Sequence, residues 1–382
     1  MRFLGQPRSA IPVSLLYLLA CGGSDSGTDP IEPPPPTVGS LRAIVVNPGL
    51  GTDADGYLVT LDGVVNQGVQ STDTVVFADL SPGPHSLNLS GFSANCRPPT
   101  SPLRMPNVVA GQTVTETYIT DCFRRFAGHI LYVRSGSSNQ MFAYLMGVGS
   151  TAIGGSTTAE FLEYPRASPD GMHLAYVHGS GTARISIADP DGKNARDLTL
   201  TCGESPAWRP DGSALAYSCA TDLYVINADG TSAIDLTNTP GEYEEHPSWS
   251  PDGTQIVYEG NNPGGGLYII DADGSNRRQL TTVSTDEDPE WSPNGNAIAF
   301  ARWNGTTRQI LTISTDGITI TEITPALANV DEAPTWSPDG SRIAFVRYLG
   351  SSWDLFDISA TGTDLTRRTF GLVVRQPGWS RQ

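Results

Sequence analysis

The sequence has few lysines and histidines and no long apolar run. Lys193 is the single lysine among 382 residues, five histidines are present, and the formal net charge is −17 at pH 7. A chain with this much negative charge repels the phosphate backbone of nucleic acids, and we therefore expect no nucleic-acid partner. A cation or a basic protein segment is the ligand that we favour. The Gly-x-Ser-x-Gly elbow, the His-Glu-x-x-His motif and the Gly-Lys-Ser/Thr phosphate loop are absent from the sequence. We therefore predict no catalytic residue and no cofactor.

The first residues resemble an export signal. Two arginines precede an apolar run over residues 11–20, which is too short to span a bilayer and is typical of a signal peptide over residues 1–20. Leu18-Leu19-Ala20-Cys21 resembles the lipobox of bacterial lipoproteins, which implies that Cys21 is lipidated after cleavage. An ordinary cleaved signal followed by an incidental cysteine is the alternative.

Glycine, serine and proline dominate residues 21–40, which include four consecutive prolines. We interpret this segment as a tether that is flexible near the lipid and stiffer beyond it. In lipoproteins similar to this one, aspartate after the cysteine favours retention in the inner membrane. Gly22 stands there, so the resemblance implies anchoring in the bacterial outer membrane, facing the periplasm or the exterior, through lipid on Cys21.

Residues 41–123 are predicted to form a small β-sandwich of immunoglobulin-like or transthyretin-like type. Short apolar and β-branched runs alternate with turn sequences such as Asp62-Gly63. The predicted strands are 42–46, 57–61, 74–77, 85–89 and 113–119. Residues 56–63 and 80–89 resemble PEGA-type surface-layer modules. A carbohydrate-binding or sensory surface role for this domain is one functional alternative.

Four cysteines lie beyond the export signal, and disulfides are chemically permitted in an exported protein. We predict the pairs Cys96–Cys122 and Cys202–Cys219, each within one domain. Cys202 precedes one strand and Cys219 ends the next antiparallel strand, so both fall at the same end of a hairpin. Unpaired buried thiols are the alternative, and the spacing does not fit a zinc site.

One phrase repeats through the rest of the chain. It reads Pro-Ser-Trp-Ser-Pro-Asp-Gly at residues 247–253, and Ala167 replaces the tryptophan in the first copy. The second proline of the phrase recurs every 41 to 45 residues, at Pro169, Pro210, Pro251, Pro293 and Pro338. A period of about 40–45 residues with a tryptophan and a glycine turn is typical of a β-propeller. We expect the tryptophans to pack between blades and not to bind a ligand.

The two ends of residues 126–382 predict how the ring closes. Residues 129–134 match the second strand of a blade without its first, and residues 375–380 match a first strand without its second. The C-terminal strand is therefore predicted to complete the first blade beside Ile130, which removes an open sheet edge. The predicted fold class is all-β: a six-bladed β-propeller closed by the C-terminal strand and preceded by the small β-sandwich.

The full repeat, Pro-x-Trp-Ser-Pro-Asp-Gly-x-x-Ile-Ala-Phe, resembles that of TolB-type six-bladed propellers over about two-thirds of the chain. This resemblance implies the propeller fold and a protein of the bacterial cell envelope. It does not extend to the N-terminal domain, which is α/β in TolB. TolB's partners are therefore not carried over to this chain.

A charged residue recurs two positions before the first proline of each copy, at Glu163, Glu204, Glu245, Glu287, Glu332 and Arg375. Equivalent positions in repeated blades lie at one height near one mouth of the channel. This ring is a candidate site for a divalent cation or a positively charged peptide segment. The alternative is structural, because regular alternation would put Glu245, Pro247 and Trp249 on one face of the strand and aim the glutamate at the neighbouring blade.

Our leading interpretation is a lipid-anchored, non-enzymatic, monomeric scaffold whose propeller binds an envelope protein or a basic peptide segment. The alternative from a different class is a metal-dependent hydrolase or lyase with its site at the channel mouth. His246 lies beside the acidic ring in the sequence, and we expect it to be a surface histidine.

Overall fold

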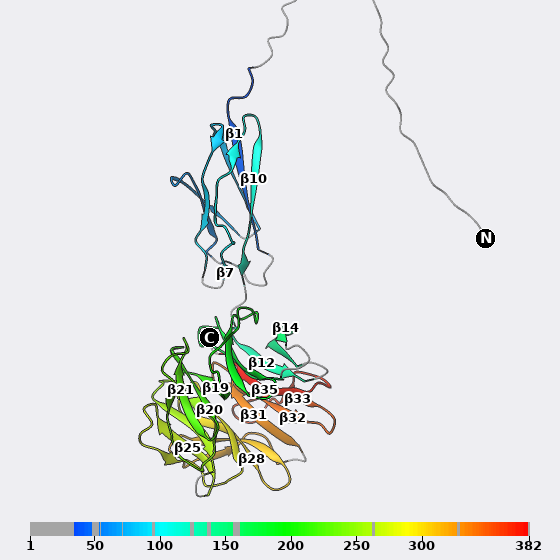
Figure 1. Cartoon of the computed structure of the whole chain (residues 1–382). Coiled ribbons are helices and arrows are strands. Elements are labelled where there is room, and N and C mark those ends of the chain that lie inside the picture. The colour runs from blue at the N-terminus through cyan, green and yellow to red at the C-terminus, as the bar shows by residue number, and fades with distance from the viewer. Residues whose placement is uncertain are drawn as a thin grey trace, which may run out of the picture.

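The computed structural model describes residues 34–47, 53, 55–70, 72–93, 96–122, 126–135, 139–155, 161–261, 264–326 and 329–380. The regular secondary structure in these ranges is β-strand, gathered in a smaller and a larger region (Figure 1). The described ranges contain no helix long and apolar enough to cross a membrane. The predicted signal peptide over residues 1–20, the lipidation site Cys21 and most of the tether lie outside the described residues.

The smaller region is a β-sandwich, as predicted. Its two main sheets have the strand orders β10-β1-β4 and β3-β2-β6-β8, and side chains from both sheets form one core. The hydroxyl of Tyr118 in β10 donates to the carbonyl of Leu87 in β6 at 2.8 Å and so links the sheets. The strands are β1 (Gly39–Val46), β2 (Tyr57–Leu61), β3 (Val65–Val69), β4 (Thr74–Leu80), β5 (Gly83–Pro84), β6 (Leu87–Ser90), β7 (Cys96–Arg97), β8 (Leu103–Arg104), β9 (Asn107–Val108), β10 (Thr113–Ile119) and β11 (Asp121–Cys122).

Two details of the sandwich differ from the sequence-based expectation. Strand β1 begins at Gly39, inside the segment expected to be tether, because Leu41, Ala43 and Val45 alternate into the core with the residues between them facing outward. Strand β3 was not predicted. Four of its five residues are exposed, so it carries little of the hydrophobic alternation from which strands are recognised.

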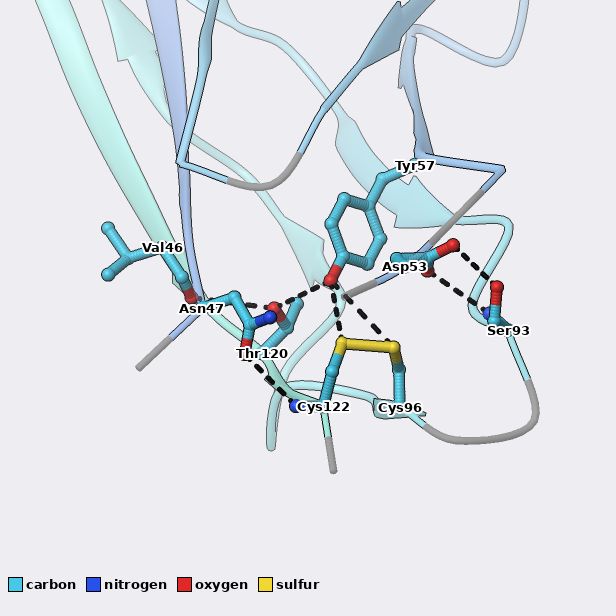
Figure 2. Close-up of a disulfide and its surroundings, with 8 residues drawn as sticks. All are labelled: Val46, Asn47, Asp53, Tyr57, Ser93, Cys96, Thr120 and Cys122. Carbon is cyan, nitrogen blue, oxygen red and sulfur yellow. Dashed lines mark hydrogen bonds between the residues drawn. A yellow bond between two sulfur atoms is a disulfide. The ribbon is translucent and has the colours of Figure 1, made fainter. Parts of the chain in front are cut away.

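A disulfide joins Cys96 to Cys122 at one end of the sandwich (Figure 2). Both side chains are buried, and the hydroxyl of Tyr57 lies 3.1 Å from Sγ of Cys122 and 3.0 Å from Oγ1 of Thr120. The side-chain oxygen of Asn47 accepts the backbone N–H of Cys122 at 3.0 Å. The disulfide and these contacts hold β11 against β7 and the end of β1.

Arg97, next to this disulfide, connects the sandwich to the propeller. Its guanidinium donates from Nε to Asp189 at 3.1 Å and from Nη1 and Nη2 to Asp191 at 3.1 and 3.0 Å. Burial disfavours the charge on Asp191, but hydrogen bonds from Arg97 and Lys193 outweigh it and lower the pKa of Asp191 to about 2. A turn in the second blade is therefore an anchoring point for the N-terminal domain.

The larger region consists of six four-stranded blades, which confirms the predicted propeller. Blade 1 has the order β14-β13-β12-β35, and a single residue pair, Arg308 with Val330, links blades 5 and 6 into one sheet. The strands of blades 1 to 3 are β12 (His129–Arg134), β13 (Gln140–Leu145), β14 (Gly149–Gly155), β35 (Val374–Trp379), β15 (Phe161–Ala167), β16 (Leu174–Gly179), β17 (Arg184–Ala188), β18 (Arg196–Asp197), β19 (Glu204–Trp208), β20 (Ala214–Cys219), β21 (Asp222–Asn227) and β22 (Ile234–Asp235).

Blades 4 to 6 repeat this layout. Their strands are β23 (Glu244–Trp249), β24 (Gln255–Gly260), β25 (Gly266–Asp271), β26 (Arg278–Gln279), β27 (Asp286–Trp291), β28 (Ala297–Trp303), β29 (Arg308–Ser314), β30 (Ile320–Glu322), β31 (Val330–Trp336), β32 (Arg342–Tyr348), β33 (Trp353–Ser359) and β34 (Thr366–Arg367). The innermost strands of blades 1 to 6 are, in that order, β35, β15, β19, β23, β27 and β31.

The C-terminal strand closes the ring as predicted. β35 pairs with β12, with Trp379 opposite Ile130, and the two strands lie side by side in Figure 1. The backbone N–H of Ser380 donates to the carbonyl of His129 at 2.8 Å, and Trp379 Nε1 donates to Gly128 at 3.2 Å. The first and last blade segments thus share one sheet, which removes the edge that an open ring would leave.

The five repeat tryptophans pack between blades, as expected. Each lies in a hydrophobic cluster that joins two consecutive blades. Ala167 takes the equivalent place between blades 1 and 2. Trp249, Trp291 and Trp336 are buried, whereas Trp208 and Trp379 are partly exposed. Blade packing therefore accounts for the tryptophan in the repeat.

Candidate binding site at the mouth of the propeller channel

A β-bulge interrupts the inner strand of every blade directly after the predicted ring position. In blade 4, Glu245 pairs with Glu259 and Ser248 pairs with Val257, so His246 and Pro247 together face one residue of β24. Two residues opposite one is the definition of a bulge, and a proline is tolerated there because no ladder hydrogen bond is needed from it. The repeat proline is thus a bulge residue within the inner strand.

The bulge corrects the alternation that we assumed for these strands. Cross-strand partners share a face of the sheet, so Glu245 lies on the face of Glu259, while Trp249 lies on the face of its own partner, Ile256. Ile256 and Glu259 are three residues apart and face opposite sides of β24. The glutamate and the tryptophan of one blade therefore lie on opposite faces.

The residue between each ring position and the proline has a left-handed backbone. These residues have φ between 49° and 52°, and they are Tyr164, Ser205, His246, Asp288, Ala333 and Gln376. Such φ values are uncommon outside glycine, and here the bulge imposes them in all six blades. All six residues line a central cavity of about 110 Å³. These six residues form a second ring, which was not predicted from the sequence. In each repeat, its member directly follows the predicted charged residue.

The predicted charged residues directly precede these bulge residues in the chain, and none of them lines the central cavity itself. Glu204 and Arg375 are exposed, and Glu163, Glu245, Glu287 and Glu332 are half-buried. Burial raises the pKa of Glu163, and Glu204 raises it further while Arg375 lowers it. Burial also raises the pKa of Glu245, to which Glu204 again contributes. The structure therefore brings ring members of neighbouring blades within electrostatic reach of one another.

Two of the five glutamates already have a cationic partner. Arg308 in β29 lies 2.8 Å from Glu287 and 2.5 Å from Glu332 through two different guanidinium nitrogens. Burial raises the pKa of both glutamates, and Arg308 opposes that rise. The single guanidinium thus pairs with both carboxylates and balances one of their two negative charges.

The other three glutamates form what we call the free acidic arc: Glu163, Glu204 and Glu245. They belong to consecutive blades 2, 3 and 4, and their carboxylates make no hydrogen bond or ion pair with the residues that the structure describes. Glu245 also lines a hollow of about 470 Å³ between blades 4 and 5, together with Glu259 and Glu287. Carboxylates without a hydrogen bond or ion pair can accept a cationic group from outside, and the hollow leaves room for such a group beside Glu245.

His246 lies in the channel wall, which corrects the expectation of a surface histidine. Nε2 is 3.0 Å from the hydroxyl of Tyr164, and Nδ1 is 3.1 Å from Glu259 and 3.5 Å from Asp288. Burial lowers the pKa of His246, but the carboxylates of Glu259 and Asp288 outweigh it and hold that pKa well above the ordinary value.

Deeper in the channel, Arg166 supplies an internal cation. Its Nη1 donates to the carbonyls of Pro165 and Gln376 at 3.1 and 3.2 Å. A Cβ at Gly378 would approach this nitrogen to 2.7 Å, so glycine leaves the room that the guanidinium occupies. Burial lowers the pKa of Arg166, and Glu290 and Asp288 act in the opposite direction. The wall of the central cavity thus contains a positive charge of its own.

The remaining predicted site residues are cysteines. The structure joins Cys96 to Cys122 and Cys202 to Cys219, with Cα atoms 4.0 and 5.3 Å apart. Cys202 lies just before β19 and Cys219 at the end of β20, as the hairpin argument requires. These cysteines stabilise the fold and contribute nothing to the channel.

A closed six-bladed ring with a polar channel defines this part of the chain as a β-propeller with a candidate binding site at its mouth. Residues 118–382 match the family model of the TolB beta propeller domain, which is more than half of the chain. The chain therefore belongs to this family. None of the curated protein sequences matches it.

Solved structures show the same fold. TolB from Acinetobacter baumannii is 20% identical, with a TM-score of 0.58 over 68% of this chain and 68% of that protein. The protein assigned as TolB in Agrobacterium tumefaciens is 21% identical, with a TM-score of 0.54 over 65% of this chain and 91% of that one. At these identities the similarity establishes the fold alone.

Proposed function

We propose that this chain is a non-enzymatic scaffold whose propeller binds a basic segment of a partner polypeptide at the free acidic arc. The observation that carries the proposal is that Glu163, Glu204 and Glu245 lie in three consecutive blades with no partner for their carboxylates among the described residues. An arginine or lysine side chain from a partner would supply the missing charge.

Burial adds to this argument. Desolvation raises the pKa of Glu163 and of Glu245, which means that their charged forms are poorly solvated. A bound cation would stabilise these charged carboxylates in place of the lost water. Part of the binding free energy would therefore come from offsetting the desolvation cost that the free protein already carries. The net charge of −17 favours the approach of a basic partner over longer distances.

The experiment is crosslinking and pull-down from the native envelope with three forms of the full chain. The wild type is compared with the triple variant E163Q/E204Q/E245Q and with the matched control E287Q/E332Q, whose glutamates are already paired with Arg308. The proposal expects a partner that is lost from the triple variant, kept by the control and released by salt. A partner captured equally by all three forms contradicts it.

We also propose that lipid on Cys21 anchors the chain in the outer membrane of a bacterial envelope. The support is the lipobox-like Leu18-Leu19-Ala20-Cys21 together with Gly22, and membership of the TolB propeller family is compatible with an envelope protein. Metabolic labelling with a radioactive fatty acid should mark the wild type and not C21S. Equal labelling, or recovery of C21S in the same outer-membrane fraction, contradicts this part of the proposal.

A further inference from the structure

His246 presents one ring nitrogen to a group of carboxylates at the boundary between blades 4 and 5. Nδ1 lies 3.1 Å from Oε2 of Glu259 and 3.5 Å from Oδ1 of Asp288. One oxygen of Glu245, one ring nitrogen of His246 and one oxygen of Glu259 form a group whose atoms are all within 4.8 Å of one another. Nδ1 is shielded from solvent and makes no well-directed hydrogen bond to the described residues.

These separations fit ligands of one metal ion. Two ligand atoms about 2.0–2.2 Å from the same ion are roughly 2.8–3.6 Å apart when the angle between their bonds is about 90–110°. Both distances from Nδ1 fall in this interval. Glu245 is farther away and would join through a bridging water or after rotation of its side chain.

The surrounding contacts orient the three donor groups. A proton on Nε2 of a neutral imidazole can be donated to the hydroxyl of Tyr164 at 3.0 Å, which leaves the lone pair of Nδ1 facing the carboxylates. Oε2 of Glu259 accepts the backbone N–H of Asp288 at 2.9 Å, and Oδ2 of Asp288 accepts the backbone N–H of Ala333 at 3.1 Å. Metal-binding histidines and carboxylates are typically held in place by outer partners of this kind.

We propose that His246, Glu259 and Glu245, with the carboxylate of Asp288 beside Nδ1, bind one divalent transition-metal ion. One imidazole and two or three carboxylates suit Zn²⁺ or Mn²⁺ better than Ca²⁺, which prefers a set of six to eight oxygen ligands. The side chains of His246, Glu259 and Asp288 are each 20 to 22% exposed.

The test is titration of the metal-free full chain with ZnCl₂ and with MnCl₂, followed by calorimetry and by elemental analysis of the desalted protein. We expect one equivalent of Zn²⁺ or Mn²⁺ and little binding of CaCl₂. E259Q and H246Q should each lower the affinity at least tenfold. Co²⁺ should give visible absorption bands in the wild type that E259Q lacks.

Two controls separate this site from other effects. H85Q removes a histidine that pairs with Asp62 at 2.7 Å in the sandwich, and it should leave the metal affinity unchanged. E163Q/E204Q removes two members of the free acidic arc outside the metal group and should also leave it unchanged, so partner binding and metal binding are scored independently. Absence of a bound equivalent in folded wild type overturns the proposal. If H246Q does not fold, the near-isosteric E259Q decides, and undiminished binding by E259Q overturns the proposal as well.

Discussion

The hydroxyl of Tyr164 lies 3.0 Å from Nε2 of His246, although Tyr164 belongs to blade 2 and His246 to blade 4. Side chains two blades apart can meet only where the channel is narrow. The left-handed bulge residues create this narrow level, since both members of the pair have positive φ. Contacts across the channel thus depend on the six bulge positions more than on the recurring Pro-x-Trp-Ser-Pro-Asp-Gly sequence.

The first prediction concerns His246 and pH. Because its folded-state pKa is raised above the ordinary value of about 6.5, its contribution to stability is fully present below pH 6.5 and is lost as pH rises through the raised value. In metal-free protein, the free energy of urea unfolding should fall across that range in the wild type and much less in H246Q. Direct NMR titration of the ring should give a pKa above 6.5. An ordinary or lowered value would contradict the assignment of Glu259 and Asp288 as its partners.

The second prediction concerns Arg308, the cation between Glu287 and Glu332. R308Q should destabilise the propeller by about 1–2 kcal/mol at pH 7, because two half-buried carboxylates lose their partner. Their pKa values would then rise further, so the deficit should shrink as the pH approaches 4 and both become neutral. The control is R196Q, since Arg196 donates to backbone carbonyls of the next blade and not to a carboxylate. A deficit in R308Q that is independent of pH would refute this electrostatic account.

The third prediction compares two repeat tryptophans. Trp291 is 4% exposed and lies in the cluster between blades 4 and 5, so W291A should cost about 3–5 kcal/mol. Trp208 occupies the equivalent position between blades 2 and 3 but is partly exposed, so W208A should cost clearly less. Chemical denaturation of both variants makes the comparison. Equal losses would show that burial does not determine the contribution of these tryptophans.

The fourth prediction concerns the link between the two domains. R97A removes the contacts to Asp189 and Asp191 and should broaden the distribution of interdomain distances in small-angle X-ray scattering. R104A, which removes a contact to Glu116 inside the sandwich, is the matched control and should leave the scattering curve unchanged. Identical curves for wild type and R97A would mean that other contacts hold the domains together.

The repeat made the propeller predictable, because Pro169, Pro210 and their equivalents mark the blades and Trp379 marks the strand that closes the ring. The bulge was not predictable in the same way. Its left-handed residues are as different as Tyr164, His246 and Ala333, and none of them is a glycine that would have signalled positive φ. Because the same backbone geometry carries different side chains in each blade, no residue type recurs that would reveal the bulge in the sequence.

Only some contacts of the candidate site could be predicted from the sequence. The sequence placed Glu163, Glu204 and Glu245 in one column, and that column predicted neighbours at the mouth of the channel. It gave no hint of Arg308, which comes from the third strand of blade 5 and reaches Glu332 in blade 6. Contacts between blades depend on the length and direction of side chains, and the sequence of a single blade gives no information about which side chain of the next blade it will meet.

Closure by β35 also has a consequence for how the chain folds. Ser380 meets His129 across a sequence separation of 251 residues, so blade 1 cannot form until nearly the whole propeller has been made. Contacts of such long range are associated with slow folding. Until β35 arrives, β12 presents an unpaired edge to other chains. During synthesis, a chaperone that shields this edge would increase the yield of native protein more than any stabilisation of the finished ring.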